Sequence, residues 1–338
     1  MSLDEELERA WDLLEAGDEP AARRVAEKLY GEDPGHPDVI LLQAACCRET
    51  GAMQDALKLL GQAAQADLNW ATPEIWAAEI LAEDPETLGQ ALQHATSALD
   101  RADEEDEFLQ AVALKAGIEI DLGKTNAARK TLEDLPPLEA GATMPAAMAL
   151  DFAHLFLEVG DVDEAERRFQ AVADGDASDA DAWHGVGLCA EARNNEEGKR
   201  RAWLRVLALD GDAPLTEPLL TEAQMAEVAD AALHELPPRV RERIANVPIL
   251  IVDLPARDEV DKGLDPRLLG MFAGSPYADA SVMGGQPQLT QILLFRKNLE
   301  RAAHSAEELG EQIRITLLHE TGHFFGMSEE DLADVGLD

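Results

Sequence analysis

The sequence contains few basic residues and few aromatic residues. Of its 338 residues, 28 are Lys or Arg and 68 are Asp or Glu, which gives a formal net charge of -40. Such a charge repels the phosphates of nucleic acids and anionic membrane surfaces. Aromatic residues make up 4% of the chain, which argues against an aromatic-rich binding surface. We therefore expect neither a nucleic acid nor a membrane as a partner.

Cysteine is also scarce. The chain has Cys46, Cys47 and Cys189, an odd number with no CxxC pair. Adjacent cysteines seldom bridge each other, so we expect three reduced residues that serve in packing.

Long apolar runs are missing as well. No stretch approaches the roughly 18 apolar residues that a membrane-spanning helix needs. Residues 1–20 are acidic and lack the basic region and apolar run of a secretory signal. The expected location is the cytoplasm.

What the sequence does contain is a series of glycine-centred turns. Gly17, Gly51, Gly123 and Gly160 each lie between two Ala/Leu-rich amphipathic stretches. Gly17 and Gly51 are 34 residues apart, and Asn194 follows Gly160 at the same spacing. Repeats of this length, made of two helices each, are typical of helical solenoids.

A small residue follows each of these glycines after five positions. The four are Ala22, Ala56, Ala128 and Ala165. A small side chain at this place lets two antiparallel helices approach closely. The pattern predicts stacked helix pairs, and the alternative is a general helical bundle.

The pattern resembles the tetratricopeptide repeat over about residues 5–212. Trp183, Val186 and Gly187 fall where that repeat has its aromatic, its aliphatic and its close-packing glycine, and Pro34 occupies the closing position of the first unit. The resemblance implies an α-solenoid whose concave surface holds a peptide or partner protein.

The repeat phase stops at residues 211–221, where two prolines interrupt the chain. We predict a repeat domain over residues 1–212, a linker over 213–220 and a second domain over 221–338. The second domain should be α+β, with its elements in a fixed order: a helix at 221–235 capped by Thr221, a short helix through RVRERI, strands at VPILIVDLP, LLGMFAG and TQILLFR, and a last helix from Ser305 to about Phe325. The strand TQILLFR is expected at an edge of the sheet, where an extended peptide can pair with it.

The last predicted helix contains His319-Glu320-Thr321-Gly322-His323. Residues four apart lie on one helix face, so His319 and His323 can bind one zinc ion side by side. Glu320 lies next to them and can take a proton from a metal-bound water. This is the physical content of the HExxH motif.

A third metal ligand is expected just after this helix. Gly326 can adopt a left-handed conformation, end the helix and reverse the chain. Glu329, three residues later, can then reach the metal with an oxygen ligand. Glu330, Asp331 and Asp334 lie nearby, and Asp331 is the first alternative.

Residues 221–338 resemble the small bacterial minimal zincin family of metallopeptidases. The resemblance rests on the order of LPPRVRERIANVPILIVDLP, LLGMFAG, QILLFRKNLE and LLHETGHFFGMSEEDL. It implies a compact α+β domain, Zn²⁺ as cofactor, and an acidic residue at the position of Glu329. The fused repeats depart from the single-domain form of that family.

Two functions remain open. In the first, the chain is a zinc metallopeptidase with Glu320 as general base, and its repeats recruit a protein substrate or partner. In the second, it is a repeat scaffold or regulatory binding protein whose zinc site is structural or latent. The intact Glu320 favours the first, because a structural site needs no base. The substrate, the cleavage preference and the oligomeric state do not follow from the sequence.

Overall fold

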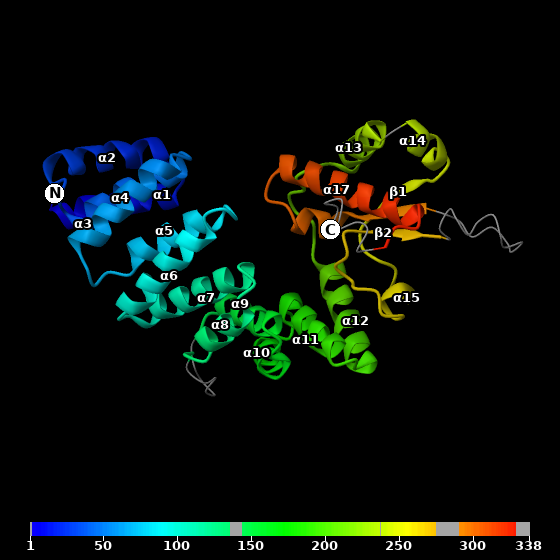
Figure 1. Ribbon diagram of the computed structural model, residues 1–338. Coiled ribbons are helices and arrows are strands. Elements are labelled where there is room, and N and C mark those ends of the chain that lie inside the picture. The colour runs from blue at the N-terminus through cyan, green and yellow to red at the C-terminus, as the bar shows by residue number, and fades with distance from the viewer. Residues whose placement is uncertain (1, 136–143, 237, 275–290, 329–338) are drawn as a thin grey trace, which may run out of the picture. The chain divides into compact units, whose positions relative to one another are not determined.

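A computed structural model describes residues 2–135, 144–236, 238–274 and 291–328 (Figure 1). The chain divides into two compact units, Met1–Arg168 and Phe169–Asp338. The division falls before the linker predicted at 213–220, which stays a prediction as a domain boundary. Among the described residues, no helix combines the length and the apolar character needed to cross a membrane.

The first unit consists of helices that pack in consecutive pairs, and each pair also contacts the next one along the chain. The bounds of its helices are α1 Leu3–Glu15, α2 Glu19–Glu32, α3 Pro37–Glu49, α4 Met53–Ala66, α5 Thr72–Ala82, α6 Leu88–Arg101, α7 Glu105–Asp121, α8 Thr125–Leu132 and α9 Ala146–Glu158. Helix α10, Val162–Gly175, contains the division between the units.

The turns between paired helices have the geometry that the glycine pattern predicts. Gly17, Gly51, Gly123 and Gly160 have φ between +70° and +80°, and Asn194 has φ 56°. Glycine adopts this left-handed conformation at no steric cost, and asparagine tolerates it best among the other residues. The alanines five positions after the glycines, Ala22, Ala56, Ala128 and Ala165, are all 0% exposed, as the close approach of the helices requires.

The second unit begins inside α10 and contains the last helix pair, α11 Ala180–Ala192 and α12 Glu196–Asp212. A Cβ on Gly187 would lie 2.1 Å from Nε1 of Trp203, a fully buried side chain of α12. A Cβ on Gly185 would lie 2.2 Å from the ring of Phe169. The predicted role of Gly187 in close packing is confirmed, and Gly185 shares it.

In the described part of the C-terminal region, residues 213–338, the predicted helices and strands come in the predicted order, and two short helices that were not predicted, Arg257–Val260 and Arg296–Arg301, lie among them. The bounds of the elements are α13 Glu222–Glu235, α14 Pro238–Ile244, β1 Ile249–Val252, α15 Arg257–Val260, β2 Gly270–Ala273, β3 Gln291–Phe295, α16 Arg296–Arg301 and α17 Ala306–Phe324. Thr221 caps α13, with Gln224 completing a capping box. The predicted fold class, a mostly helical chain with a helical-repeat solenoid and a small α+β region, is confirmed.

The three strands form one sheet in the order β1-β3-β2. Strand β1 pairs with β3 in parallel, and β2 pairs with β3 in antiparallel. The expectation that TQILLFR lies at an edge is therefore wrong, because β3 is the central strand. Within the described sheet, the edge strands are β1 and β2.

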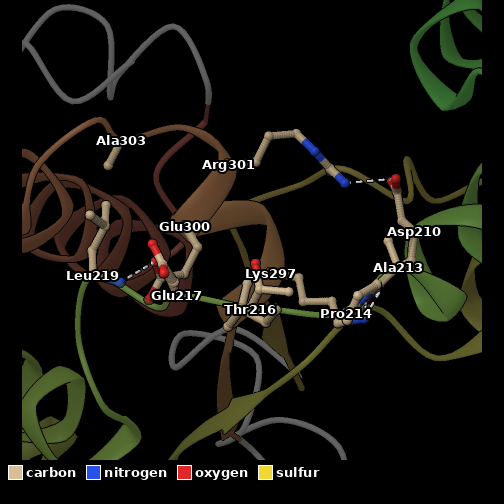
Figure 2. Close-up of a pocket in the computed structure, with 11 residues that line it drawn as sticks. Asp210, Ala213, Pro214, Thr216, Glu217, Leu219, Lys297, Glu300, Arg301 and Ala303 are labelled. Atoms are coloured by element: carbon tan, nitrogen blue, oxygen red, sulfur yellow. Dashed lines mark hydrogen bonds and ion pairs between the residues drawn. The ribbon is translucent and has the colours of Figure 1, made fainter. Parts of the chain in front are cut away.

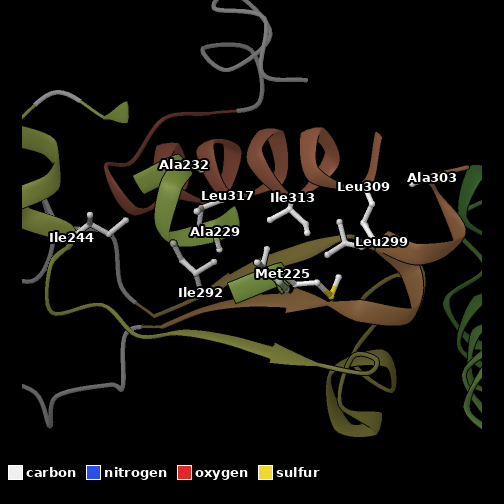
Figure 3. Close-up of a cluster of buried hydrophobic side chains, with 11 residues drawn as sticks. Met225, Ala229, Ala232, Ile244, Ile292, Leu299, Ala303, Leu309, Ile313 and Leu317 are labelled. Atoms are coloured by element: carbon white, nitrogen blue, oxygen red, sulfur yellow. The ribbon is translucent and has the colours of Figure 1, made fainter. Parts of the chain in front are cut away.

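Helix α17 packs on this sheet through one apolar stripe. Leu309, Ile313 and Leu317, spaced four residues apart, are 0% exposed and belong to one buried cluster with Ile292 of β3 (Figure 3). Residues of α13 complete the cluster, among them Met225. The stripe holds α17 along the sheet, and this fixes which way the remaining faces of the helix point.

Two glycine substitutions test the packing of the second unit. Gly187→Ala should destabilise it by about 1–3 kcal/mol, because the added methyl group has no room beside Trp203. Gly310→Ala is the matched control within α17, since a Cβ there meets nothing within 4 Å. It should stabilise by roughly 0.5–1 kcal/mol. Urea unfolding followed by tryptophan fluorescence measures the change in the free energy of unfolding for each variant. Equal changes in the two variants would contradict the close packing assigned to Gly187.

Candidate metal centre

The predicted motif lies in the last turns of α17. The N-cap is Ser305, whose Oγ accepts from the backbone N–H of Glu308 at 3.1 Å. The sequence Ser305-Ala306-Glu307-Glu308 predicts a capping box, but the Glu308 carboxylate accepts from the N–H of His304, at 2.8 Å, so the box is only half formed. Because the apolar stripe of α17 faces the core, His319 and His323 lie on a partly buried face beside it.

The two histidines come together as predicted. Their Nε2 atoms are 2.9 Å apart, and the rings meet edge to face with centroids 4.7 Å apart. Two imidazole nitrogens converge at one point in this arrangement.

The left-handed glycine turn seen in the repeats recurs at Gly326, after the end of α17. Gly326 has φ 83°. Its N–H donates to the carbonyl of His323 at 2.9 Å, and the N–H of Met327 donates to the carbonyl of Gly322 at 3.1 Å. These two bonds define a Schellman motif, so the predicted left-handed end of the helix is confirmed.

Because the chain reverses here, the backbone carbonyl of Met327 lies beside the ring of His323. The Nδ1 atom of His323 is 3.2 Å from the carbonyl oxygen of Met327. A carbonyl has no proton to give, so Nδ1 must donate. In the neutral ring, Nε2 then carries the lone pair, which is the form that binds a metal.

Glu320 reaches in a different direction, toward strand β2. Its Oε2 atom accepts a hydrogen bond from the backbone N–H of Phe272 at 2.6 Å, and the residue is 7% exposed. The N–H of Phe295 donates to the carbonyl of Leu269, which makes these two residues a hydrogen-bonded pair. Such pairs alternate along antiparallel strands, so the N–H of Phe272 points away from β3. Glu320 thus binds the outer edge of β2.

The close approach of α17 and β2 depends on Gly270. A Cβ there would lie 2.5 Å from Cγ2 of Thr316 and 3.0 Å from the carbonyl oxygen of Leu293. Phe272 and Phe324 also meet edge to face, with ring centroids 5.7 Å apart. A larger residue at position 270 would separate the helix from the strand to which Glu320 binds.

A cavity of about 490 Å³ opens beside these groups. Apolar side chains from β2 and the chain reversal line it, together with the histidines and Glu320. The lining residues are Leu268, Gly270, Met271, Phe272, Gly274, His319, Glu320, His323, Gly326, Met327 and Ser328.

The donor set fits a zinc ion in part. Nitrogen ligands lie about 2.0–2.1 Å from zinc, so two of them on one ion are at most about 4.2 Å apart, and the 2.9 Å separation of the Nε2 atoms lies within that limit. The described residues contain no group of three or more His, Cys, Asp or Glu side chains arranged for a metal. The predicted third ligand Glu329 and its alternative Asp331 lie outside the described residues, and so do Glu330 and Asp334.

Two contacts of this site were not predicted from the sequence. One is the bond from Phe272 to Glu320, and the other is the bond from His323 to Met327. Both use backbone groups, whose positions carry no residue-type signal. Only the glycine at position 270, in LLGMFAG, indicated a close approach of two chain segments.

Comparisons with known families agree with this geometry. Residues 244–337 match a family described as Zincin-like metallopeptidase. Residues 13–80 and 150–214 match two families described as Tetratricopeptide repeat. The predicted resemblance, a zincin-like domain fused to N-terminal tetratricopeptide repeats, is confirmed. No curated protein matches the chain significantly.

Solved structures resemble the chain in its repeats. One is a Pseudomonas aeruginosa protein described as pilF, with 16% identity, a TM-score of 0.50, and coverage of 62% of this chain and 92% of that one. Another is PilW, described as a type IV pilus biogenesis factor, with 15% identity, a TM-score of 0.50, and coverage of 62% and 94%. At these identities the likeness shows the fold alone.

Substitution of Gly326 tests whether the chain reversal supports metal binding. Gly326→Val strains the left-handed turn and should release the Met327 carbonyl from His323. Loss of such an outer contact typically weakens metal binding about 10–100-fold. Gly326→Asn is the control, because asparagine tolerates this conformation and should keep most of the affinity. Titration of zinc against a competing chelator measures the zinc affinity of the two variants and the unchanged protein. Equal affinities for Gly326→Val and the unchanged protein would contradict a role of the chain reversal in metal binding.

Proposed function

We propose that the chain is a zinc-dependent metallopeptidase whose tetratricopeptide repeats recruit a protein substrate or partner. The observation that supports it best is the convergence of the two Nε2 atoms at a cavity that the buried carboxylate of Glu320 also lines. The zincin-like family match supports the same chemistry. The proposed location remains the cytoplasm.

The proposed metal ligands are His319, His323 and Glu329. The hydrogen bond from His323 to the carbonyl of Met327 holds that ring with its Nε2 lone pair toward the metal position. Zinc, when bound, would act as a Lewis acid on the scissile carbonyl and bring the pKa of a bound water to about 7.

Glu320 is the proposed general base. The N–H of Phe272 occupies one lone pair of its carboxylate, and a carboxylate has about four such positions. A carboxylate that accepts this bond can also take a proton from the attacking water. It then passes that proton to the nitrogen of the leaving amine.

The substrate is proposed to lie along the outer edge of β2. This strand lines the cavity and is an edge strand of the described sheet, whereas β3 is enclosed by its two neighbours. An extended peptide beside β2 would bond to its outward backbone groups and bring its own carbonyl toward the two histidines.

The second candidate, a repeat scaffold with a latent or structural site, is favoured by one observation. The outward N–H of Phe272 is already bonded to Glu320. A peptide that pairs with β2 must compete for this donor, and such competition would keep an unpartnered site inactive.

The first experiment compares the full chain with Glu320→Gln. We expect about one zinc per chain in both proteins, because Glu320 is not a proposed ligand, and loss of cleavage only in the variant. A proteome-wide comparison of newly formed N-termini would reveal cleavage. Zinc without any cleavage by the unchanged protein would favour the scaffold function, and carefully prepared protein without zinc would rule out both functions.

The second experiment addresses the third ligand. Glu329→Ala should lower zinc affinity by at least about tenfold, since it removes one of three protein ligands. Asp331→Ala is the matched control and should leave the affinity within about twofold. Isothermal titration with zinc measures both, and the reverse order would assign the ligand to Asp331 instead.

A further inference from the structure

The segment that leads into β2 is held by the last helix pair of the repeats. Nε of Arg267 donates to Asp210 at 3.2 Å, and its Nη1 lies 2.6 Å from a carboxylate oxygen of Asp181. Asp210 is in the last turn of α12 and is 3% exposed. One guanidinium group thus joins both helices of the pair to the residues just before β2.

The same segment has a second contact with α11. Nε2 of His184 lies 3.0 and 3.1 Å from the two carboxylate oxygens of Asp265. Asp265 also accepts the backbone N–H of Arg267 at 2.8 Å. Burial alone raises the pKa of Asp265, but the hydrogen bonds and the positive charges of His184 and Arg267 outweigh it and hold the pKa below its ordinary value. The carboxylate form therefore persists near neutral pH.

Asn298 of α16 holds the segment from another side. Its Nδ2 atom donates to the carbonyls of Pro266 and Leu268, at 2.8 and 2.7 Å, and the residue is 2% exposed. Arg301 contacts both Asn298 and Asp210. Its Nη1 donates to Oδ1 of Asn298, and its Nη2 atom lies 2.6 Å from the Asp210 carboxylate (Figure 2). Asp210 is therefore the common partner of two arginines.

Burial makes the contact with Asp210 costly to break. Its carboxylate is 3% exposed, so the loss of one of its charged partners destabilises it more than the loss of a surface partner would. The pair of Arg200 and Asp261 joins α12 to the end of α15 at 2.9 Å, but both side chains are 50% exposed. Exposed pairs of this kind contribute little. The Arg267–Asp210 and Arg200–Asp261 pairs both join α12 to the chain segment before β2, and they differ in burial.

The path from Arg267 to the site is short. Leu268 lines the cavity, and Gly270 packs against Thr316 of α17. Phe272 then donates its N–H to Glu320. Strand β2 has only four residues, so a shift at its start moves the N–H to which Glu320 binds.

We propose that Arg267, anchored by Asp210 of the last repeat helix, is a positioning residue for the candidate site. It fixes the start of β2, and through the N–H of Phe272 it fixes the carboxylate of Glu320. The last helix pair is then a structural part of the site as well as a part of the repeats. The activity consequence rests on the proposed function, but the positional claim does not.

The decisive test is amide hydrogen exchange of the full chain, read in peptides that cover residues 268–274. Arg267→Ala should raise exchange there by at least about tenfold, at temperatures well below unfolding, because β2 loses its anchor. Arg200→Ala is the matched control and should leave it unchanged. Glu320→Ala gives the reference rate for a Phe272 N–H without its acceptor.

Arg267→Lys guards against a variant that does not fold. Lysine keeps the charge but cannot bridge Asp181 and Asp210 with a planar fork. We therefore expect an exchange rate at residues 268–274 that lies between the rates of the unchanged protein and of Arg267→Ala. Unchanged exchange at 268–274 in both variants, or an equal rise in Arg200→Ala, would overturn the proposal.

Activity supplies an independent readout. Arg267→Ala should lower kcat/KM by about ten- to hundredfold, mainly through kcat, with zinc content unchanged. If the unchanged protein cleaves nothing, the proposed function fails while the exchange result still decides the role of Arg267. A fall in kcat/KM carried by KM alone would contradict positioning of the base.

Discussion

The hydrogen bond from the backbone N–H of Phe272 to the carboxylate of Glu320 joins the helix of the motif to the strand that lines the cavity. It forms only if three separate conditions hold. The apolar stripe of α17 must face the sheet, so that the motif is turned toward β2. Position 270 must have no side chain, so that helix and strand can approach. The register of β2 on β3 must leave the N–H of Phe272 on the outer edge. A one-residue slip would turn that N–H inward and leave a buried carboxylate without its donor, which is costly.

The second constraint is the chain reversal after α17. A pair of histidines four residues apart places two rings side by side, but it does not decide which nitrogen of each ring is protonated. Gly326 decides it for His323, because the left-handed turn brings the carbonyl of Met327 onto Nδ1. The same turn reverses the chain just before the acidic residues that begin at Glu329. One glycine therefore serves both the proposed ligand His323 and the proposed third ligand Glu329.

The sequence was sufficient wherever the signal is local. Helix periodicity placed His319, Glu320 and His323, and the spacing of glycines placed the repeat turns. The sequence did not predict contacts between segments that lie far apart in the chain. The run TQILLFR has the same composition at the centre of a sheet as at its edge, and its parallel pairing with β1 has no signature in either strand alone. Asp210, in LALDGD, matched the end of a repeat unit, and nothing near it showed that two arginines about 60 and 90 residues later would bind it.

These contacts also bear on how the proposed enzyme would be controlled. A partner that binds α11 or α12 can change the site only if it binds more tightly to one position of the segment at 265–270 than to another. The buried pairing of Asp210 with Arg267 makes that segment follow the helix pair closely. A peptide on the edge of β2 acts at the other end of the same strand, because it competes with Glu320 for the N–H of Phe272. Because this bond holds the proposed base in position, a peptide that takes the donor would displace the carboxylate of Glu320. Both ends of β2 therefore act on the base through the same N–H.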